Sequence, residues 1–164
     1  MNEPALGSAA PPPAWTSSIA VHHADDATAD PRAALTRGLR AAHATGLALA
    51  EAAEGWILAA EADDLAEAFA TLQRDAEEAV HRVEYILAGL RKGARGGTSW
   101  IGPAAAPAAA MAATLERVAQ ETLRLESLAH DLAEYQAARL LRMSAEEYQA
   151  SARRLAALSS EEAP

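Results

Sequence analysis

The break between two long Ala- and Leu-rich stretches of this chain reads Thr98-Ser99-Trp100-Ile101-Gly102-Pro103-Ala104-Ala105. On both sides of it, small and apolar residues recur at alternating spacings of four and three, which places them on one face of a helix. Glycine favours a chain reversal, and proline is tolerated in the first turn of a helix but not in its interior. We therefore expect Trp100, Gly102 and Pro103 to form the turn of an antiparallel helical hairpin.

The two arms of this hairpin are predicted over residues 65–92 and 104–142. The apolar face of the first arm consists of Leu65, Phe69, Leu72, Val83, Ile86 and Leu90. The apolar face of the second arm consists of Met111, Leu115, Val118, Leu125, Leu128 and Leu132. These two faces are expected to pack on each other and to provide the packing or partner interface, and truncating one large buried member to alanine should cost about 2–4 kcal/mol.

A further helix is predicted before the hairpin, over residues 31–60. Asp30 can cap it, and Pro31 suits the first helical position because the N–H that proline lacks would have no partner there. The apolar spacing slips at residues 61–64, where Asp64 and Glu67 have the form of a capping box. The pattern leaves open whether residues 31–92 form one helix or two.

A short fourth helix is predicted over residues 145–158, because Ser144 and Glu147 have the same capping-box form. Residues 1–29 are rich in proline and polar residues and are expected to be a disordered tail. Residues 159–164 are expected to fray. The sequence therefore predicts an all-α domain over residues 30–158, an antiparallel hairpin with an additional N-terminal helix and a short C-terminal helix in bundle-like or coiled-coil packing.

Composition excludes several classes of function. Apolar residues make up 51% of the 164-residue chain, but alanine dominates them, so any core is thin. The net charge of −9 repels phosphate backbones, which argues against nucleic-acid binding. The sequence has no cysteine, no apolar run long enough to span a membrane, and no recognisable secretory signal. We expect a cytoplasmic protein, or one secreted without a cleaved signal peptide.

The residues that could carry chemistry are few. Glu78 and His81 have the Glu-x-x-His spacing of carboxylate-bridged metal bundles, but such sites need a second copy of the motif and two further acidic residues. Glu126, His130 and Glu134 could at most provide the second half of such a metal site. No nucleophile motif is present, and the Gly-rich residues 93–98 lack the order of a phosphate-binding loop. We expect no catalytic residue, no metal site and no cofactor, and hence no enzyme.

The segment from Thr98 to Ala105 resembles the turn of the Trp-x-Gly (WXG) family of type VII, or ESX-type, secretion substrates. The resemblance extends over roughly residues 60–142. It implies a small helical hairpin that pairs with itself or with a sister protein into a four-helix bundle and is exported folded. The export signal of that family, Tyr-x-x-x-Asp/Glu, does not occur here, because Tyr135 is followed by Arg139 and Tyr148 by Ala152.

These observations lead to one functional prediction and two alternatives. The prediction is a non-enzymatic interaction protein that forms a homodimer, or a heterodimer with a related small helical protein. The first alternative is a structural or adaptor/chaperone coiled-coil protein that is not exported. The second alternative is a metal-binding helical bundle.

Overall fold

Long helices follow directly from the Ala-, Leu- and Glu-rich composition, because these residues have the most favourable helix propensities. A computed structural model describes residues 30–101 and 108–161 of the chain. Within these residues there are four helices and no strand: α1 (Pro31–Ala59), α2 (Asp63–Gly89), α3 (Ala108–Asp131) and α4 (Tyr135–Glu161). The all-α, bundle-like fold predicted from the sequence is confirmed. The predicted tail over residues 1–29 and the chain end at 162–164 lie outside the described residues.

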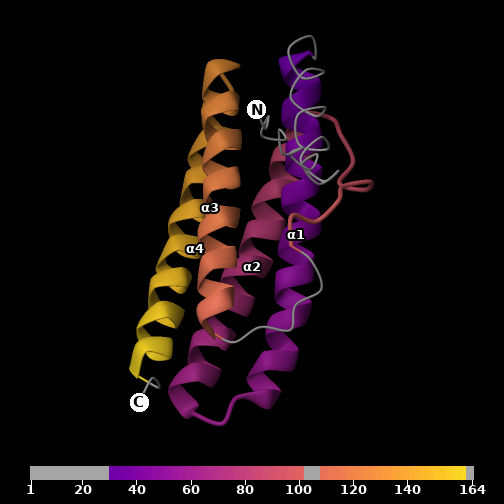
Figure 1. Ribbon diagram of the computed structural model, residues 1–164. Coiled ribbons are helices and arrows are strands. Elements are labelled where there is room, and N and C mark those ends of the chain that lie inside the picture. The colour runs from indigo at the N-terminus through magenta and orange to yellow at the C-terminus, as the bar shows by residue number, and fades with distance from the viewer. Residues whose placement is uncertain (1–29, 102–107, 162–164) are drawn as a thin grey trace, which may run out of the picture. The chain divides into compact units, whose positions relative to one another are not determined.

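The helices pair in chain order. The short turn at residues 60–62 joins α1 to α2, and the turn at residues 132–134 joins α3 to α4, so each pair forms an antiparallel αα-hairpin (Figure 1). Residues 31–92 are thus two helices. The two hairpins pack on each other through α2 against α4 and, less extensively, through α1 against α3. Going round the bundle, the order of the helices is α1, α2, α4, α3.

The connection from α2 to α3 crosses the length of the bundle. Figure 1 shows its described part running back beside α1, so that α3 begins at the end of the bundle where α1 turns into α2. An α-helix of 27 residues, the length of α2, is about 40 Å long. Residues 90–107 are enough to cover this distance, because an extended chain spans about 3.3 Å per residue. As a result α2 and α3 run parallel and lie diagonally opposite each other.

This arrangement corrects the predicted hairpin around Trp100. The arms at residues 65–92 and 104–142 were expected to be antiparallel neighbours, but α2 and α3, which make up most of these ranges, are not adjacent. Their apolar faces meet only across the axis of the bundle, and in parallel register. Phe69 and Leu72 share one core cluster with Met111 and Leu115. Toward the other end the residues that share a second cluster are Val83, Ile86 and Leu125.

Most of the predicted interface residues lie in these two clusters. Those that are buried are Phe69, Leu72, Val83, Ile86, Met111, Leu115, Val118 and Leu125. Those that are partly buried against the clusters are Leu65, Leu90, Leu128 and Leu132. The same core includes Leu35, Leu39 and Leu49 of α1. The apolar face of α1 is therefore covered by the chain's own α2.

The predicted helix over 104–142 is two helices, α3 and α4, separated at Leu132–Glu134. Ala133 has a left-handed backbone with φ 60°. The N–H of Ala133 donates to the carbonyl of His130 (3.0 Å), and the N–H of Glu134 donates to that of Ala129 (2.9 Å). This pair of bonds is the Schellman arrangement that ends a helix. The left-handed position of this arrangement usually holds glycine or asparagine. Because alanine occupies it here, the sequence contains no signal that a helix ends at this point.

The other predicted helix ends shift for related reasons. Arg91, with φ 56°, holds the left-handed position after α2. At the start of α2 the capping residue is Ala62, which provides no side-chain hydrogen bond, and Asp63 and Asp64 lie in the first turn. Carboxylates there are favoured by the helix dipole. Ser144 starts no helix and lies inside α4.

Close approach of α1 and α2 depends on Gly46. A Cβ atom at this position would lie 2.7 Å from Cγ2 of Val80 and 3.3 Å from the carbonyl oxygen of Ala76. Gly55, nine residues further along α1, has no atom within 4 Å of the corresponding position. The backbones of α1 and α2 therefore meet closely at Gly46 but not at Gly55.

Alanine substitutions at these two glycines should act in opposite directions. Gly46→Ala is expected to lower the free energy of unfolding by about 1 kcal/mol, because the overpacking cost exceeds the gain in helix propensity. Gly55→Ala is expected to raise it by about 0.5–1 kcal/mol, because only the propensity changes. Urea denaturation of both variants checks the prediction. A stabilised Gly46→Ala variant would contradict the close approach.

None of the helices in the described ranges is both long enough and apolar enough to cross a membrane.

Candidate functional site

Trp100 is held between α1 and α3 by hydrogen bonds from both sides. Its backbone N–H donates to Oγ1 of Thr45 (2.7 Å), a buried residue of α1. Its carbonyl oxygen accepts a long hydrogen bond from the Arg117 guanidinium of α3 (3.5 Å). The partly buried side chain packs against both core clusters. Trp100 thus closes the side of the bundle where α1 and α3 have little direct contact with each other.

The bundle interior beside Trp100 is almost completely filled. A cavity of about 10 Å³ remains there. It is lined by residues of all four helices together with the tryptophan: Ala42, Ala79, Val83, Trp100, Val118, Thr122, Leu141, Ser144 and Tyr148. A space of this size holds at most one water molecule. No substrate or organic cofactor fits at this point of the bundle.

The connection before Trp100 lies directly on α1. A Cβ atom at Gly97 would lie 1.9 Å from the carbonyl oxygen of Arg40, so only glycine permits this approach. Nε of Arg40 donates to the carbonyl of Gly93 (2.9 Å), and Oγ of Ser99 lies 3.4 Å from Oγ1 of Thr45. The segment from Gly93 to Trp100 is therefore fastened along α1 by its backbone as well as by the indole.

Trp100 accordingly occupies the middle of the bundle rather than the tip of a hairpin. The sequence predicted that Trp100, Gly102 and Pro103 form the turn of a hairpin. Gly102 and Pro103 lie outside the described residues. Trp100 instead packs between α1 and α3, against both core clusters.

A row of polar side chains runs along the contact between α2 and α4, and we call it the polar ladder. Its α2 members are Thr71, Asp75, Glu78, Arg82 and Tyr85, and its α4 members are Gln136, Ser144, Glu147, Ser151 and Arg154. The members bond across the interface, at one end through Arg154 to Thr71 (3.0 Å) and at the other through Gln136 to Tyr85 (3.1 Å). In between, Oγ of Ser151 donates to the Asp75 carboxylate (3.2 Å).

Arg82 is the centre of the ladder. Its side chain is only 14% exposed. Both terminal nitrogens donate to the Glu147 carboxylate of α4, with 2.8 Å from Nη2 to Oε1. The same guanidinium also donates to Glu78 (2.8 Å) and to Oγ of Ser144 (3.1 Å). The hydrogen bond with Glu147 raises the pKa of Arg82, so this cation stays charged.

The ladder contains more negative than positive charge around Arg82. Burial raises the pKa of Asp75, and the neighbouring Glu147 and Glu78 carboxylates raise it further. The hydrogen bond from Ser151 and the charge of Arg74 act in the opposite direction. Burial also raises the pKa of Tyr148, which keeps that phenol neutral. The ladder can pair opposite charges across the contact between α2 and α4, and it can thereby select one register of α2 against α4.

The raised pKa of Asp75 predicts a pH-dependent stability. Because the folded protein favours the protonated carboxyl, the stabilisation from this group is complete below the unfolded pKa and is lost as pH rises through the folded value. Asp75→Asn should therefore raise the melting temperature at pH 7, where an amide oxygen can still accept the Ser151 bond. The difference from the unchanged protein should shrink as pH falls toward about 4.

Thermal unfolding monitored by circular dichroism at several pH values measures this difference. Glu77→Gln, two residues away and exposed, is the matched control and should leave the pH profile unchanged. An Asp75→Asn variant that is less stable than the unchanged protein at pH 7 would contradict the prediction.

The polar ladder was not predicted from the sequence, although its residues follow a recognisable pattern. Its α2 residues recur at spacings of four, three, four and three, immediately beside the apolar face. The spacing that looked like a capping box, Ser144 and Glu147, is part of this pattern, because both side chains contact Arg82. Polar residues at heptad spacing on two helices were the evidence that these helices pair.

The candidate metal ligands lie apart. Glu78 binds Arg82, whereas the side chain of His81 is 78% exposed and lies 3.5 Å from Glu84. Glu126 and Glu134 accept from Arg142 and Arg32, respectively. In the part of the chain that the structure describes, no three His, Asp or Glu side chains come together in a way that could hold a metal ion.

An apolar depression lies at the surface, where the end of α2 meets the start of α4. We call it the Tyr85 groove; its volume is about 290 Å³. It is lined by Tyr85, Ile86, Ala88, Gly89 and Leu90 of the α2 end and by Glu134, Gln136 and Ala137 of the α4 start. Tyr85 is 59% exposed and Tyr135, next to the groove lining in sequence, is 64% exposed. Exposed tyrosines are enriched in binding surfaces.

Comparison of the chain with protein-family models, curated proteins and solved structures finds no match.

Proposed function

We propose that this protein is a non-enzymatic helical interaction protein that pairs with itself or with a sister protein. The observation that supports this most directly is the filled interior: the bundle axis has a cavity of only about 10 Å³ beside Trp100. The nearly buried Arg82 and Asp75 side chains bind partners within the polar ladder. Recognition then depends on the outer surface, where exposed aromatic and apolar side chains occur.

Two forms of this function follow, and one observation favours the second of them. A WXG-type secretion substrate contributes one hairpin and shares its apolar seam with a sister protein. In this chain α1 and α4 cover the apolar faces of α2 and α3. Because the apolar faces are already covered, this observation favours the adaptor or chaperone form, in which the folded four-helix bundle binds its partner without opening. We propose this form as the second candidate.

Co-expression with the product of the adjacent gene tests the function. We expect a stable complex of defined stoichiometry, measured by light scattering after size-exclusion chromatography. Hydrogen exchange within the complex then separates the two forms. If α1–α4 are as protected in the complex as in the free protein, the adaptor form is supported. If α1 and α4 lose protection in the complex, the form that shares its apolar face with a sister protein is supported.

The absence of any complex, both with the neighbouring product and between copies of the chain, would contradict the proposed function. Appearance of the full chain in the medium only in cells with an active type VII system would support the secretion form. Export that is independent of such a system would count against that form.

A further inference from the structure

The Tyr85 groove has a basic rim. Arg91 and Lys92 follow Leu90 directly and are exposed, and Arg139 is exposed one turn beyond Gln136 on α4. The one carboxylate of the groove lining, Glu134, accepts a hydrogen bond from Arg32 (3.2 Å). The groove thus offers an apolar floor and an exposed tyrosine, with the exposed cations Arg91, Lys92 and Arg139 close to its lining in sequence.

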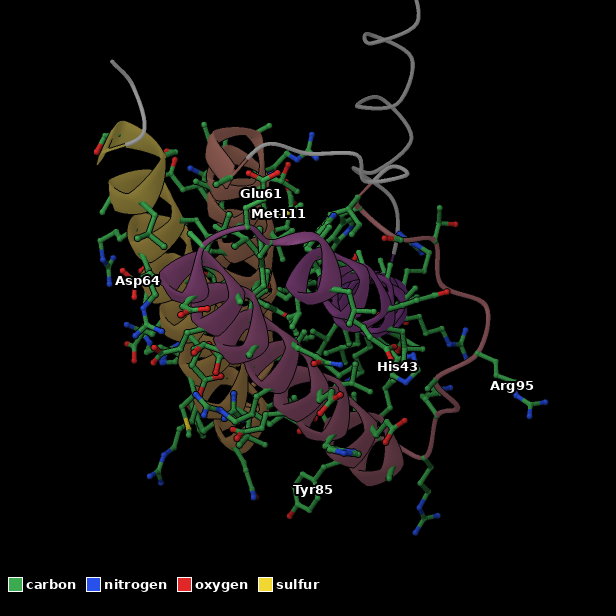
Figure 2. All side chains as sticks on the ribbon, turned by 90° about the horizontal axis from the view of Figure 1, so that it is seen from below. His43, Glu61, Asp64, Tyr85, Arg95 and Met111 are labelled. Atoms are coloured by element: carbon green, nitrogen blue, oxygen red, sulfur yellow. The ribbon has the colours of Figure 1, made fainter. Side chains whose placement is uncertain are left out.

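The opposite end of the same chain has the complementary chemistry. We define the acidic tip as the end of α1, the turn at 60–62 and the start of α2. Its exposed carboxylates are those of Glu51, Glu54, Glu61, Asp63, Asp64 and Glu67. The sequence has no lysine or arginine between Arg40 and Arg74. Figure 2 looks at the bundle from this end and shows Glu61 and Asp64 at the turn, with Tyr85 at the far end of α2.

An apolar side chain accompanies these carboxylates. Leu58, in the last turn of α1, is 85% exposed, more than any other large apolar residue of the described chain. A leucine on a highly charged surface offers a single anchor for a small apolar groove, and burying one leucine is a substantial contribution to a weak contact. The acidic tip therefore carries both elements that the groove can bind.

We propose that the acidic tip of one copy docks in the Tyr85 groove of a second copy, with Leu58 on the groove floor and the carboxylates facing Arg91, Lys92 and Arg139. This inference rests on the proposed interaction function and specifies its partner as a second copy of the chain. Because groove and tip lie at opposite ends of α2, the contact is heterologous and leaves a free groove and a free tip on every pair.

The proposed contact between tip and groove is small, so we expect the association to be weak. Interfaces below about 1,200 Å² are characteristic of transient complexes. Attraction between exposed charges is screened over about 10 Å at 0.1 M salt. Association of the chain should therefore be reversible, dependent on concentration and weakened by salt.

Sedimentation velocity of the full chain measures these properties. Over concentrations from about 10 µM to 1 mM, the weight-average mass is expected to rise above the 17.1 kDa of one chain. Raising NaCl from about 50 to 500 mM should weaken the association several-fold. A chain that stays monomeric at the highest concentration and lowest salt would overturn the inference.

A pair of matched leucine variants tests the anchor. Leu58→Asp is expected to weaken the association about 10- to 100-fold, the loss expected for one buried leucine. Leu47→Asp places the same charge on another exposed leucine of α1, away from the tip, and should weaken it much less. Circular dichroism establishes that both variants fold. Equal effects of the two substitutions would overturn the assignment of Leu58.

Mixing two defective variants tests the head-to-tail geometry. Leu58→Asp keeps an intact groove, and the double variant Lys92→Glu/Arg139→Glu keeps an intact tip. Each alone is expected to remain monomeric, whereas an equimolar mixture should form pairs that do not grow further. A mixture as monomeric as its components would overturn head-to-tail docking.

Failure of this inference is distinguishable from failure of the proposed function. If copies of the chain do not associate but the complex with the neighbouring gene product forms, the partner is a different protein and the self-docking inference is overturned. If neither association occurs, the interaction function itself is overturned.

Discussion

Replacing Arg82 with methionine is expected to lower the free energy of unfolding at pH 7 by about 2–4 kcal/mol, since removing one partner of a buried ion pair leaves the other charge uncompensated. The substitution keeps much of the side-chain volume but leaves Glu78 and Glu147 without their shared cation. It also leaves Asp75 beside two carboxylates that already raise its pKa. The partial exposure of Glu147 places the expected loss below that of a fully buried pair.

The deficit of the Arg82→Met variant should depend on pH. Protonation of the carboxylate cluster removes the repulsion, so the difference from the unchanged protein is expected to decrease between pH 7 and about pH 4. Guanidinium chloride would screen this effect, so urea denaturation is the suitable measurement. Arg74→Met is the matched control, because Arg74 is 66% exposed and 3.7 Å from Asp75, and it should cost less than about 1 kcal/mol.

Two results would contradict this account of the ladder. One is an Arg82→Met variant as stable as the unchanged protein at pH 7, which would mean that the apolar contacts of methionine replace the ion pair fully. The other is a deficit that is the same at pH 7 and pH 4, which would assign the loss to packing rather than to charge.

Replacing Trp100 with alanine is expected to cost about 2–4 kcal/mol, somewhat less than for a fully buried tryptophan. The indole packs against both core clusters and fills space between α1 and α3. Its loss should also release the connection, so amides of residues 93–101 and the facing part of α1 are expected to exchange faster with solvent. Urea denaturation and hydrogen exchange measure the two effects.

The control for Trp100→Ala is Leu47→Ala, a truncation at an exposed position of α1, which should change stability by less than about 0.5 kcal/mol. Unchanged exchange around Thr45 in the Trp100→Ala variant would contradict the role of the indole in fastening the connection. A loss of stability no larger than that of Leu47→Ala would contradict its role in packing.

Much of the local structure could be predicted from the sequence. The apolar residues of α2 and α3 are in the core because their four-and-three spacing puts them on one face of a helix wherever that helix packs. The start of α1 at Pro31 follows from the fixed φ of proline, which suits the first helical position. Signals of this kind depend only on residues within one or two helical turns. They therefore hold however the helices are arranged in space.

Helix ends were harder to predict where unusual residues adopt the left-handed conformation. Ala133 and Arg91 end α3 and α2 in positions that glycine normally occupies. Their local cost is outweighed by the contacts that the two turns permit elsewhere in the bundle. Conversely, Ser144 and Glu147 look like a helix start but bind Arg82 on another helix.

The sequence by itself determined that the chain is helical and which faces of the helices are apolar. Only the tertiary structure decided which helices are neighbours. The apolar stripes of α2 and α3 are compatible with either a direct or a diagonal relation, because leucine packing is not directional. The path of the connection along α1 and the directional bonds of Arg82 to Glu147 select the diagonal one.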